Sequence, residues 1–304
     1  DLWVTIITSF KCTELKMLKK VLEKSRLKSE AKNGAKIDTL YEIYPGGSDI
    51  TMKIGEMVSE FHELFQHPIA ADITPELLEL RAGLIREEAV DEAAEAVEHL
   101  DMDKVLDAMA DGLYVGIGTL ISVRGGVVNA MAHFTKEQSE DIYTSYVHAH
   151  SKKPQEDIIL GLSQFGVAAE ELEVIAAKIR SGYADSTSLA VDLRGAMNRI
   201  YVASQMVYHL ADLMNVPVVD LVAEVHRSNM TKLWPSDAEQ RTKLVEGCKY
   251  DKNDLAFRVA EGRDGMIGYR ISDGKILKSP TYESADLSKF VDMAIDSVIG
   301  RHFF

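Results

Sequence analysis

The sequence predicts an all-α protein that ends in a small β-hairpin extension. From Ile54 to about Ala132, apolar residues recur at the spacing of amphipathic helices, and the same periodicity returns further along the chain. The segment from Leu233 to Phe304 differs, because its apolar residues alternate around Asp273-Gly274, a dipeptide that favours a tight two-residue turn. A closing helix, ADLSKFVDMAIDSVIG, follows this ribbon.

Length and composition restrict the classes of protein to consider. A chain of 304 residues can form two ordinary domains with a substantial core. It contains no run of about eighteen apolar residues, which predicts no membrane span. Cys12 and Cys248 are too few for a disulfide framework or a zinc motif, which favours a cytoplasmic location. No secretory leader is visible, although the sequence starts at Asp1 rather than at a methionine.

The net charge of −14 argues against binding of a nucleic-acid polymer through its phosphates. A single nucleotide is not excluded by this charge. A triphosphate can enter an acidic site when magnesium bridges the two sets of negative oxygens and a few Lys or Arg side chains assist.

The N-terminal segment, residues 1–50, begins with the apolar run DLWVTIITSF, continues as a lysine-rich amphipathic stretch and reaches a turn at PGGSD. We assign it no function. Further along, Thr74-Pro75-Glu76 is a good helix start, because Thr is a favoured cap and Pro suits the first turn.

Five carboxylates lie on two amphipathic helical segments between Leu84 and Val115. Residues three or four apart share a helix face, so these acids form neighbouring pairs. Like charges at this distance repel unless water or a hard divalent cation neutralises them. The acids are Glu87, Glu88, Asp91, Asp107 and Asp111.

A solvated acidic helix face is the simpler interpretation of EEAVDEAAEAVE. The second segment favours a metal site instead, because Asp107 and Asp111 interrupt the otherwise apolar run VLDAMADGLYVGIGTL. Buried acids require partners. The sequence therefore predicts a Mg²⁺ site, which Mn²⁺ could also occupy, with all five acids as candidate ligands.

The pattern of Glu-Glu followed three residues later by an acid, and then of Asp before Leu-Tyr-Val, resembles the MazG-like all-α nucleoside triphosphate pyrophosphohydrolases. The distant relatives of this superfamily include the dimeric dUTPases. Two other segments resemble its phage and bacterial branch, MVSEFHELFQHPIA from Met57 and VHRSNMTKLW from Val225. Many members carry a Glu where this chain has Ala108, and Asp107 is the expected substitute on the same helical face.

The second half of the chain is interpreted as a decayed copy of the first. RGGVVNAMAH and NVPVVDLVAE align without gaps at an offset of 91, and LGLSQFGVAAEELEVI can be laid on AGLIREEAVDEAAEAV. In the second copy, Phe165, Gly166 and Ala169 replace the first group of acids, and Asn198 and Val202 stand near the second. Such groups cannot hold magnesium. The alternative is that two helical bundles share the pattern by chance.

Together these observations predict a tandem MazG-like helical bundle with a C-terminal hairpin extension. The predicted divisions are an N-terminal segment (1–50), a catalytic repeat (51–134), a degenerate repeat (135–232) and the extension (233–304).

The resemblance implies hydrolysis of a nucleoside triphosphate to monophosphate and pyrophosphate. Glu87, Glu88, Asp91 and Asp111 are the expected catalytic acids, and Glu87 is suggested as the base that orients water. His226, Asn229 and Lys232 are expected to bind the substrate after VHRSNMTK folds back over the acids, although a satisfied helix end is a simpler role for His226. Lys275 and Lys278 could reach the triphosphate or lie on a solvated hairpin edge.

Three alternatives stay open. The enzyme could be specialised for one base, as a dUTPase or a dCTPase. It could instead be a nucleotide sensor or assembly protein that binds magnesium nucleotide without cleaving it. A homodimer, as in some relatives, also stays open.

Overall fold

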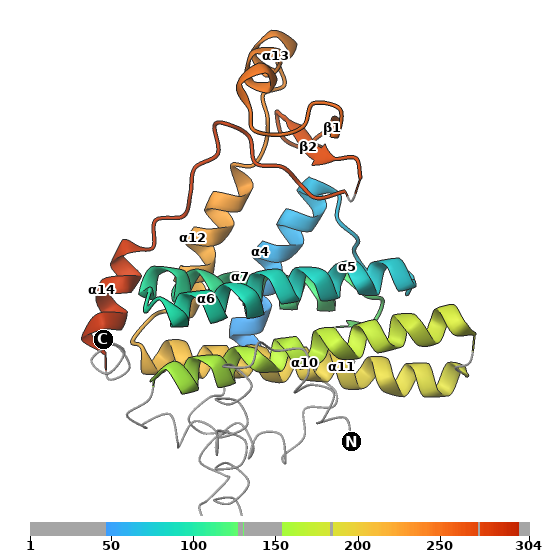
Figure 1. Ribbon diagram of the computed structural model, residues 1–304, viewed down its shortest axis with the longest axis vertical. Coiled ribbons are helices and arrows are strands. Elements are labelled where there is room, and N and C mark those ends of the chain that lie inside the picture. The colour runs from blue at the N-terminus through green and yellow to red at the C-terminus, as the bar shows by residue number, and fades with distance from the viewer. Residues whose placement is uncertain (1–46, 127–129, 131–153, 183–184, 273, 298–304) are drawn as a thin grey trace, which may run out of the picture.

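The computed structural model describes residues 47–126, 130, 154–182, 185–272 and 274–297. These residues form a helical bundle that carries a small two-stranded sheet at one end (Figure 1). The all-α prediction with a small β extension is confirmed. The elements in chain order are α4 (Gly47–Phe65), α5 (Pro75–Ile85), η1 (Arg86–Asp91), α6 (Glu92–Glu98), α7 (Met102–Ser122), α10 (Pro154–Ser181), α11 (Ser186–Leu213), α12 (Val218–Met230), α13 (Ala238–Gly247), β1 (Leu255–Val259), β2 (Met266–Arg270) and α14 (Ser288–Asp296).

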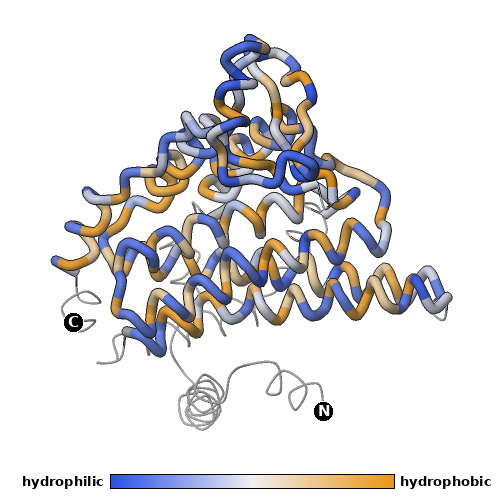
Figure 2. The backbone as a smooth tube through the Cα atoms, turned by 45° about the horizontal axis from the view of Figure 1, so that its top comes forward, coloured by the Kyte–Doolittle hydropathy of each residue, from blue (hydrophilic) through white to orange (hydrophobic). Residues whose placement is uncertain are grey.

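Helix α7 is the centre of the bundle. It contacts α4, α11, α12, α14 and the continuous rod formed by α5, η1 and α6. Most of its residues are buried, including Leu106, Met109 and Leu113. Gly116 allows a close approach from the opposite helix, because a Cβ at this position would lie 2.5 Å from the Phe165 ring. Along the helices hydrophobic and hydrophilic residues alternate at helical spacing (Figure 2), as expected for amphipathic helices around one core.

The start of α5 follows the sequence prediction. The Thr74 side chain accepts a hydrogen bond from the Leu77 amide, and Pro75 occupies the first turn. Asp101 caps α7 in the same way by accepting from the Lys104 amide. These caps satisfy amides that have no partner within the helix.

Helices α10 and α11 form a long hairpin that packs along the rod and against α7 (Figure 1). The positions that correspond to the acids in the proposed second copy are part of this apolar interface, since Phe165 and Ala169 are fully buried. Asn198 is also buried and donates to the Ala130 carbonyl. Much of RGGVVNAMAH lies outside the described residues, so the duplication remains a hypothesis.

Helix α7 is long and apolar enough to cross a membrane by length and composition. Helices α11 and α12 taken together are also long and apolar enough, but they are bent by 108° where they meet. Within the protein, 78% of the apolar window of α7 is buried. This is the position of a core helix.

The C-terminal extension pairs its strands differently from the expectation. The sequence suggested a ribbon centred on Asp273-Gly274, whereas the described strands β1 and β2 are antiparallel partners joined by the loop 260–265. After the turn, the chain returns along β2 through an isolated bridge from Tyr269 to Ile276. Trp234 joins β2 to the returning segment, because its buried indole donates to the Leu277 carbonyl and packs on Gly268.

Candidate metal centre

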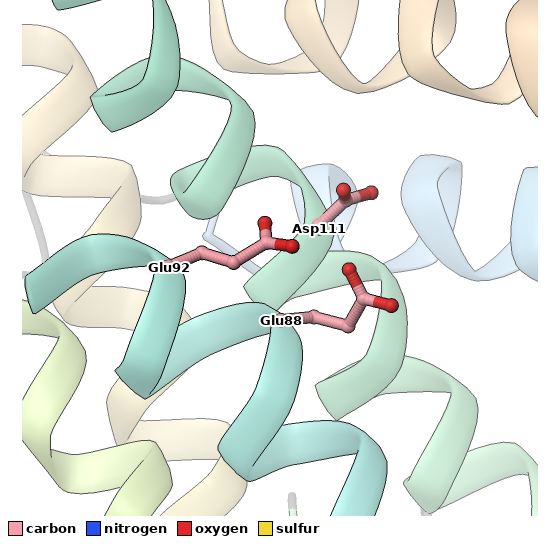
Figure 3. Close-up of side chains that lie close together, drawn as sticks. All are labelled: Glu88, Glu92 and Asp111. Carbon is pink, nitrogen blue, oxygen red and sulfur yellow. The ribbon is translucent and has the colours of Figure 1, made fainter. Parts of the chain in front are cut away.

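Three carboxylates meet beside α7. Glu88, Glu92 and Asp111 each offer an oxygen, and these oxygens lie within 4.8 Å of one another. Figure 3 shows Glu88 and Glu92 on the rod and Asp111 on α7, with their carboxylate groups directed into the same space. All three are half-buried. Three hard oxygen donors at this spacing suit Mg²⁺ or Mn²⁺ better than a softer metal.

The π-helical turn η1 explains why Glu92 belongs to this group. The Glu92 amide donates to the Glu87 carbonyl, five residues earlier, so one extra residue is accommodated between α5 and α6. This wider turn places Glu88 and Glu92, four residues apart, on the face that meets Asp111. Ala89, in the same turn, is fully buried and would contact a Cβ placed on Gly112, which holds the rod close to α7.

The electrostatics of this group favour a cationic partner. Burial, then the neighbouring Asp107 and Glu88, raises the pKa of Asp111 well above its usual range. Burial, then Glu88 and Asp107, raises the pKa of Glu92 to about 7. Burial and the neighbouring Glu87 raise the pKa of Glu88. Each ionised carboxylate therefore disfavours ionisation of the others, and a bound divalent cation would relieve this repulsion.

The structure separates the other acids proposed from the sequence. Asp107 is half-buried and lies one turn before Asp111. Burial is the main cause of the raised pKa of Glu92, and the charge of Asp107 adds to it. It is not among the three converging acids, and its role as the substitute for the Glu missing at Ala108 stays a prediction. Glu87 and Asp91 are exposed. Neither belongs to the group of three, and the Glu87 carboxylate instead accepts from Lys275 Nζ at 2.7 Å.

Lys232 faces the carboxylates from the end of α12, more than a hundred residues further along the chain. Burial lowers its pKa, while the negative charges of Asp111 and Glu88 act in the opposite direction. Its ammonium lies 5.5 Å from the centre of the Phe61 ring. The segment VHRSNMTK therefore does fold back to the acids, as the sequence analysis expected.

The side chains of His226 and Asn229 are held by Tyr114, which follows Asp111 by one turn on α7. The Tyr114 hydroxyl is 2.9 Å from His226 Nδ1 and also bonds to the Asn229 side chain. His226 Nε2 is 3.2 Å from a Glu60 carboxylate oxygen. Both ring nitrogens of His226 therefore have protein partners, which favours the simpler role of a satisfied residue near the helix end. Substrate binding by His226 and Asn229 stays a prediction.

Beyond Tyr114, the end of α4 carries basic and aromatic side chains. His67 stacks on Phe61 with ring centres 5.4 Å apart. Burial lowers the pKa of His67 to about 3, and the neighbouring His62 and Arg81 act in the same direction. Arg81 is buried and donates to the Val115 carbonyl and Thr119 hydroxyl. This side of the site is neutral to basic, in contrast to the carboxylate group.

Glu92 is the residue that sequence reasoning missed. The sequence prediction paired Asp91 with Glu87 and Glu88 and passed over Glu92, although a regular α-helix would place Glu92 on the same face as Glu88 as well. The available signal was weak: Glu92 follows Glu88 by four residues, as Asp111 follows Asp107, so both segments carry the same spacing of acids.

Comparison with known proteins gives a family match for the segment that contains these acids. Residues 58–124, which include all the acids above, match the family described as phosphoribosyl-ATP pyrophosphohydrolase. The resemblance to the MazG-like superfamily is confirmed for this segment. The chain is 24% identical over 253 residues to "Uncharacterized protein L479" of Acanthamoeba polyphaga mimivirus, an alignment that covers 78% of this chain and 95% of that protein. No solved structure matches the chain.

Proposed function

We propose that this protein is a magnesium-dependent nucleoside triphosphate pyrophosphohydrolase that releases monophosphate and pyrophosphate. The family matched by residues 58–124 hydrolyses pyrophosphate bonds of nucleotides. The observation that carries the proposal is the meeting of Glu88, Glu92 and Asp111 opposite Lys232. Phosphoryl chemistry needs this combination, because negative oxygens must be neutralised from more than one side.

Glu88, Glu92 and Asp111 would hold the metal, with Asp107 assisting. When bound, Mg²⁺ supplies positive charge to the phosphate oxygens and lowers the pKa of a bound water. Glu87, suggested as the base by its position, is engaged by Lys275. Orientation of the attacking water is therefore assigned to a carboxylate of the half-buried group.

Two lysines near the acids favour a polyphosphate as the substrate. Lys232 interacts electrostatically with Asp111 and Glu88, and Lys278 acts on the pKa of Glu88 by lowering it, against the dominant effect of burial. Lys275 is paired with Glu87, so its charge is not counted here. Lys232 would contact the phosphates as a point charge, and Asn229 would offer a donor and an acceptor to the sugar or base.

The first prediction tests this function with a panel of the eight common ribo- and deoxynucleoside triphosphates. In the presence of Mg²⁺, we expect monophosphate and pyrophosphate in equal amounts from at least one of them, measured by anion-exchange chromatography. Chelation of the metal should abolish turnover. Release of diphosphate and phosphate would place the cleavage at the other bond. Tight binding of a magnesium nucleotide without any product would favour the alternative function, a sensor or assembly protein that binds the nucleotide without cleaving it.

The second prediction concerns Lys232. Replacement by Met keeps the buried aliphatic volume and removes the charge, and we expect KM to rise by roughly tenfold while kcat changes less, as for a contact made equally to substrate and transition state. Arg241→Met is the matched control, because this basic residue also lies over a phenylalanine, Phe257, but within the C-terminal extension. Equal kinetics of the two variants would place Lys232 outside the substrate site.

A further inference from the structure

The two strands and the turn that follows them are docked on the catalytic bundle at several points. We call residues 255–272 and 274–278 the basic ribbon. At one end, Arg258 donates to the Phe65 carbonyl at 2.6 Å and Gln66 donates to the Val259 carbonyl at 2.9 Å, both at the end of α4. In the loop between the strands, Arg263 pairs with Glu60 of α4. All three contacts are made with the C-terminal part of α4 or with the residue that follows it.

One ion pair joins the other end of the ribbon to the π-helical turn. Lys275 Nζ lies 2.7 Å from a carboxylate oxygen of Glu87. Glu87 is the residue directly before Glu88, but its side chain is 54% exposed and is not among the three that converge. Adjacent residues of the same turn thus face different partners: Glu88 the other acids, and Glu87 the ribbon.

The ion pair between Lys275 and Glu87 lies three residues before Lys278, on the same segment of the ribbon. The turn at Gly274 is closed by the Arg270 amide, which donates to the Lys275 carbonyl at 2.9 Å, and the Leu277 amide donates to Gly268 at 2.8 Å. Lys275 and Leu277 are thus both bonded to β2, and the Lys278 carbonyl accepts from the Tyr250 hydroxyl at 3.1 Å, so the segment from Lys275 to Lys278 is held as one unit. Lys278 is exposed at the end of this segment, close enough to the acids to interact electrostatically with Glu88, Glu92 and Asp107.

We propose that Glu87 is a positioning residue: its ion pair with Lys275 holds the basic ribbon beside the carboxylate group, so that Lys278 faces the polyphosphate of the substrate. The role of Lys278 rests on the proposed function. The docking of the ribbon by Glu87 does not, because it is made within the protein without metal or nucleotide.

The docking is tested first on the metal-free protein by hydrogen–deuterium exchange. We expect faster exchange in peptides covering residues 266–278 in Glu87→Gln and in Lys275→Gln, with no further increase in the double variant. Glu95→Gln is the control, since Glu95 also forms an exposed pair with a lysine, Lys104 at 3.1 Å, away from the ribbon. Wild-type exchange in Glu87→Gln would overturn the proposal, whether or not the protein is an enzyme.

The functional part is tested by a double-mutant cycle with Lys278→Met. Exposed ion pairs contribute modestly, so Glu87→Gln should raise KM by up to about fivefold and leave kcat within about twofold. Because Glu87 acts through Lys278, the double variant should match Lys278→Met alone. A large loss of kcat together with weakened Mn²⁺ binding in Glu87→Gln would make Glu87 a metal ligand and overturn the proposal. If the wild type hydrolyses no nucleotide, the proposed function fails while the exchange experiment still decides the docking.

Discussion

Asp111→Asn is expected to lower kcat/KM by at least about a hundredfold, in line with the loss of a strong electrostatic contact in a transition state. Asp111 is the member of the carboxylate group supplied by α7, and burial raises its pKa well above the usual range of an aspartate. Asparagine keeps the shape and one oxygen but removes the negative charge that would hold the metal. Initial rates over a range of Mg²⁺ concentrations measure this effect.

The same change should stabilise the metal-free protein. A carboxyl group whose pKa is raised on folding binds its proton more tightly in the native than in the unfolded state, so its ionisation lowers stability as pH rises above about 3.8. Asparagine cannot ionise, and its advantage in Tm should therefore grow from pH 4 to pH 8. Asp220→Asn, at an exposed position of α12, is the control for both measurements. If Asp111→Asn lowered both the activity and the Tm, the loss of activity would reflect destabilisation, which would contradict the assignment of Asp111 as a metal ligand.

Much of the fold could be predicted from the sequence because helical periodicity is a local property. The start of α5 at Thr74 and Pro75 was identified from two adjacent residues, whose capping role needs no tertiary context. The pairing of β1 with β2 was not predicted, because the two strands are joined by the loop 260–265, whereas the alternation used to place the ribbon surrounds Asp273-Gly274. Contacts of this kind cannot be read from alternation alone.

The candidate site shows the same limit. Glu88 and Asp111 were found because acids within apolar helices are conspicuous, and Lys232 because its segment resembles a known one. Asp91 and Glu92 follow Glu88 by three and four residues, so a regular α-helix would place both beside it. The π-helical turn distinguishes the two, and it depends on how the rod packs against α7 and α10. Spacing in the sequence alone could therefore not select Glu92.

This difference of one residue yields the last prediction, a comparison of Glu92→Gln with Asp91→Asn. The structure directs Glu92 to Glu88 and Asp111, whereas Asp91 is exposed. Calorimetric titration with Mn²⁺ should show affinity reduced by at least about tenfold, or about 1.4 kcal/mol, in Glu92→Gln and changed by less than about twofold in Asp91→Asn. The opposite ranking would mean that Asp91, and not Glu92, is the metal ligand.

The dependence on pH gives the same comparison a second, independent readout. The pKa of Glu92 is raised to about 7, mainly by burial, so below that pH a metal ion must displace a proton from it. The Mn²⁺ affinity of the wild-type protein and of Asp91→Asn should therefore fall as pH decreases from 8 to 6. Glu92→Gln carries no proton to displace at this position, and its affinity should fall less steeply over the same range. If the Mn²⁺ affinity of all three proteins fell equally with pH, Glu92 would not be part of the metal centre, because removing its ionisable group would then have no effect on the pH dependence.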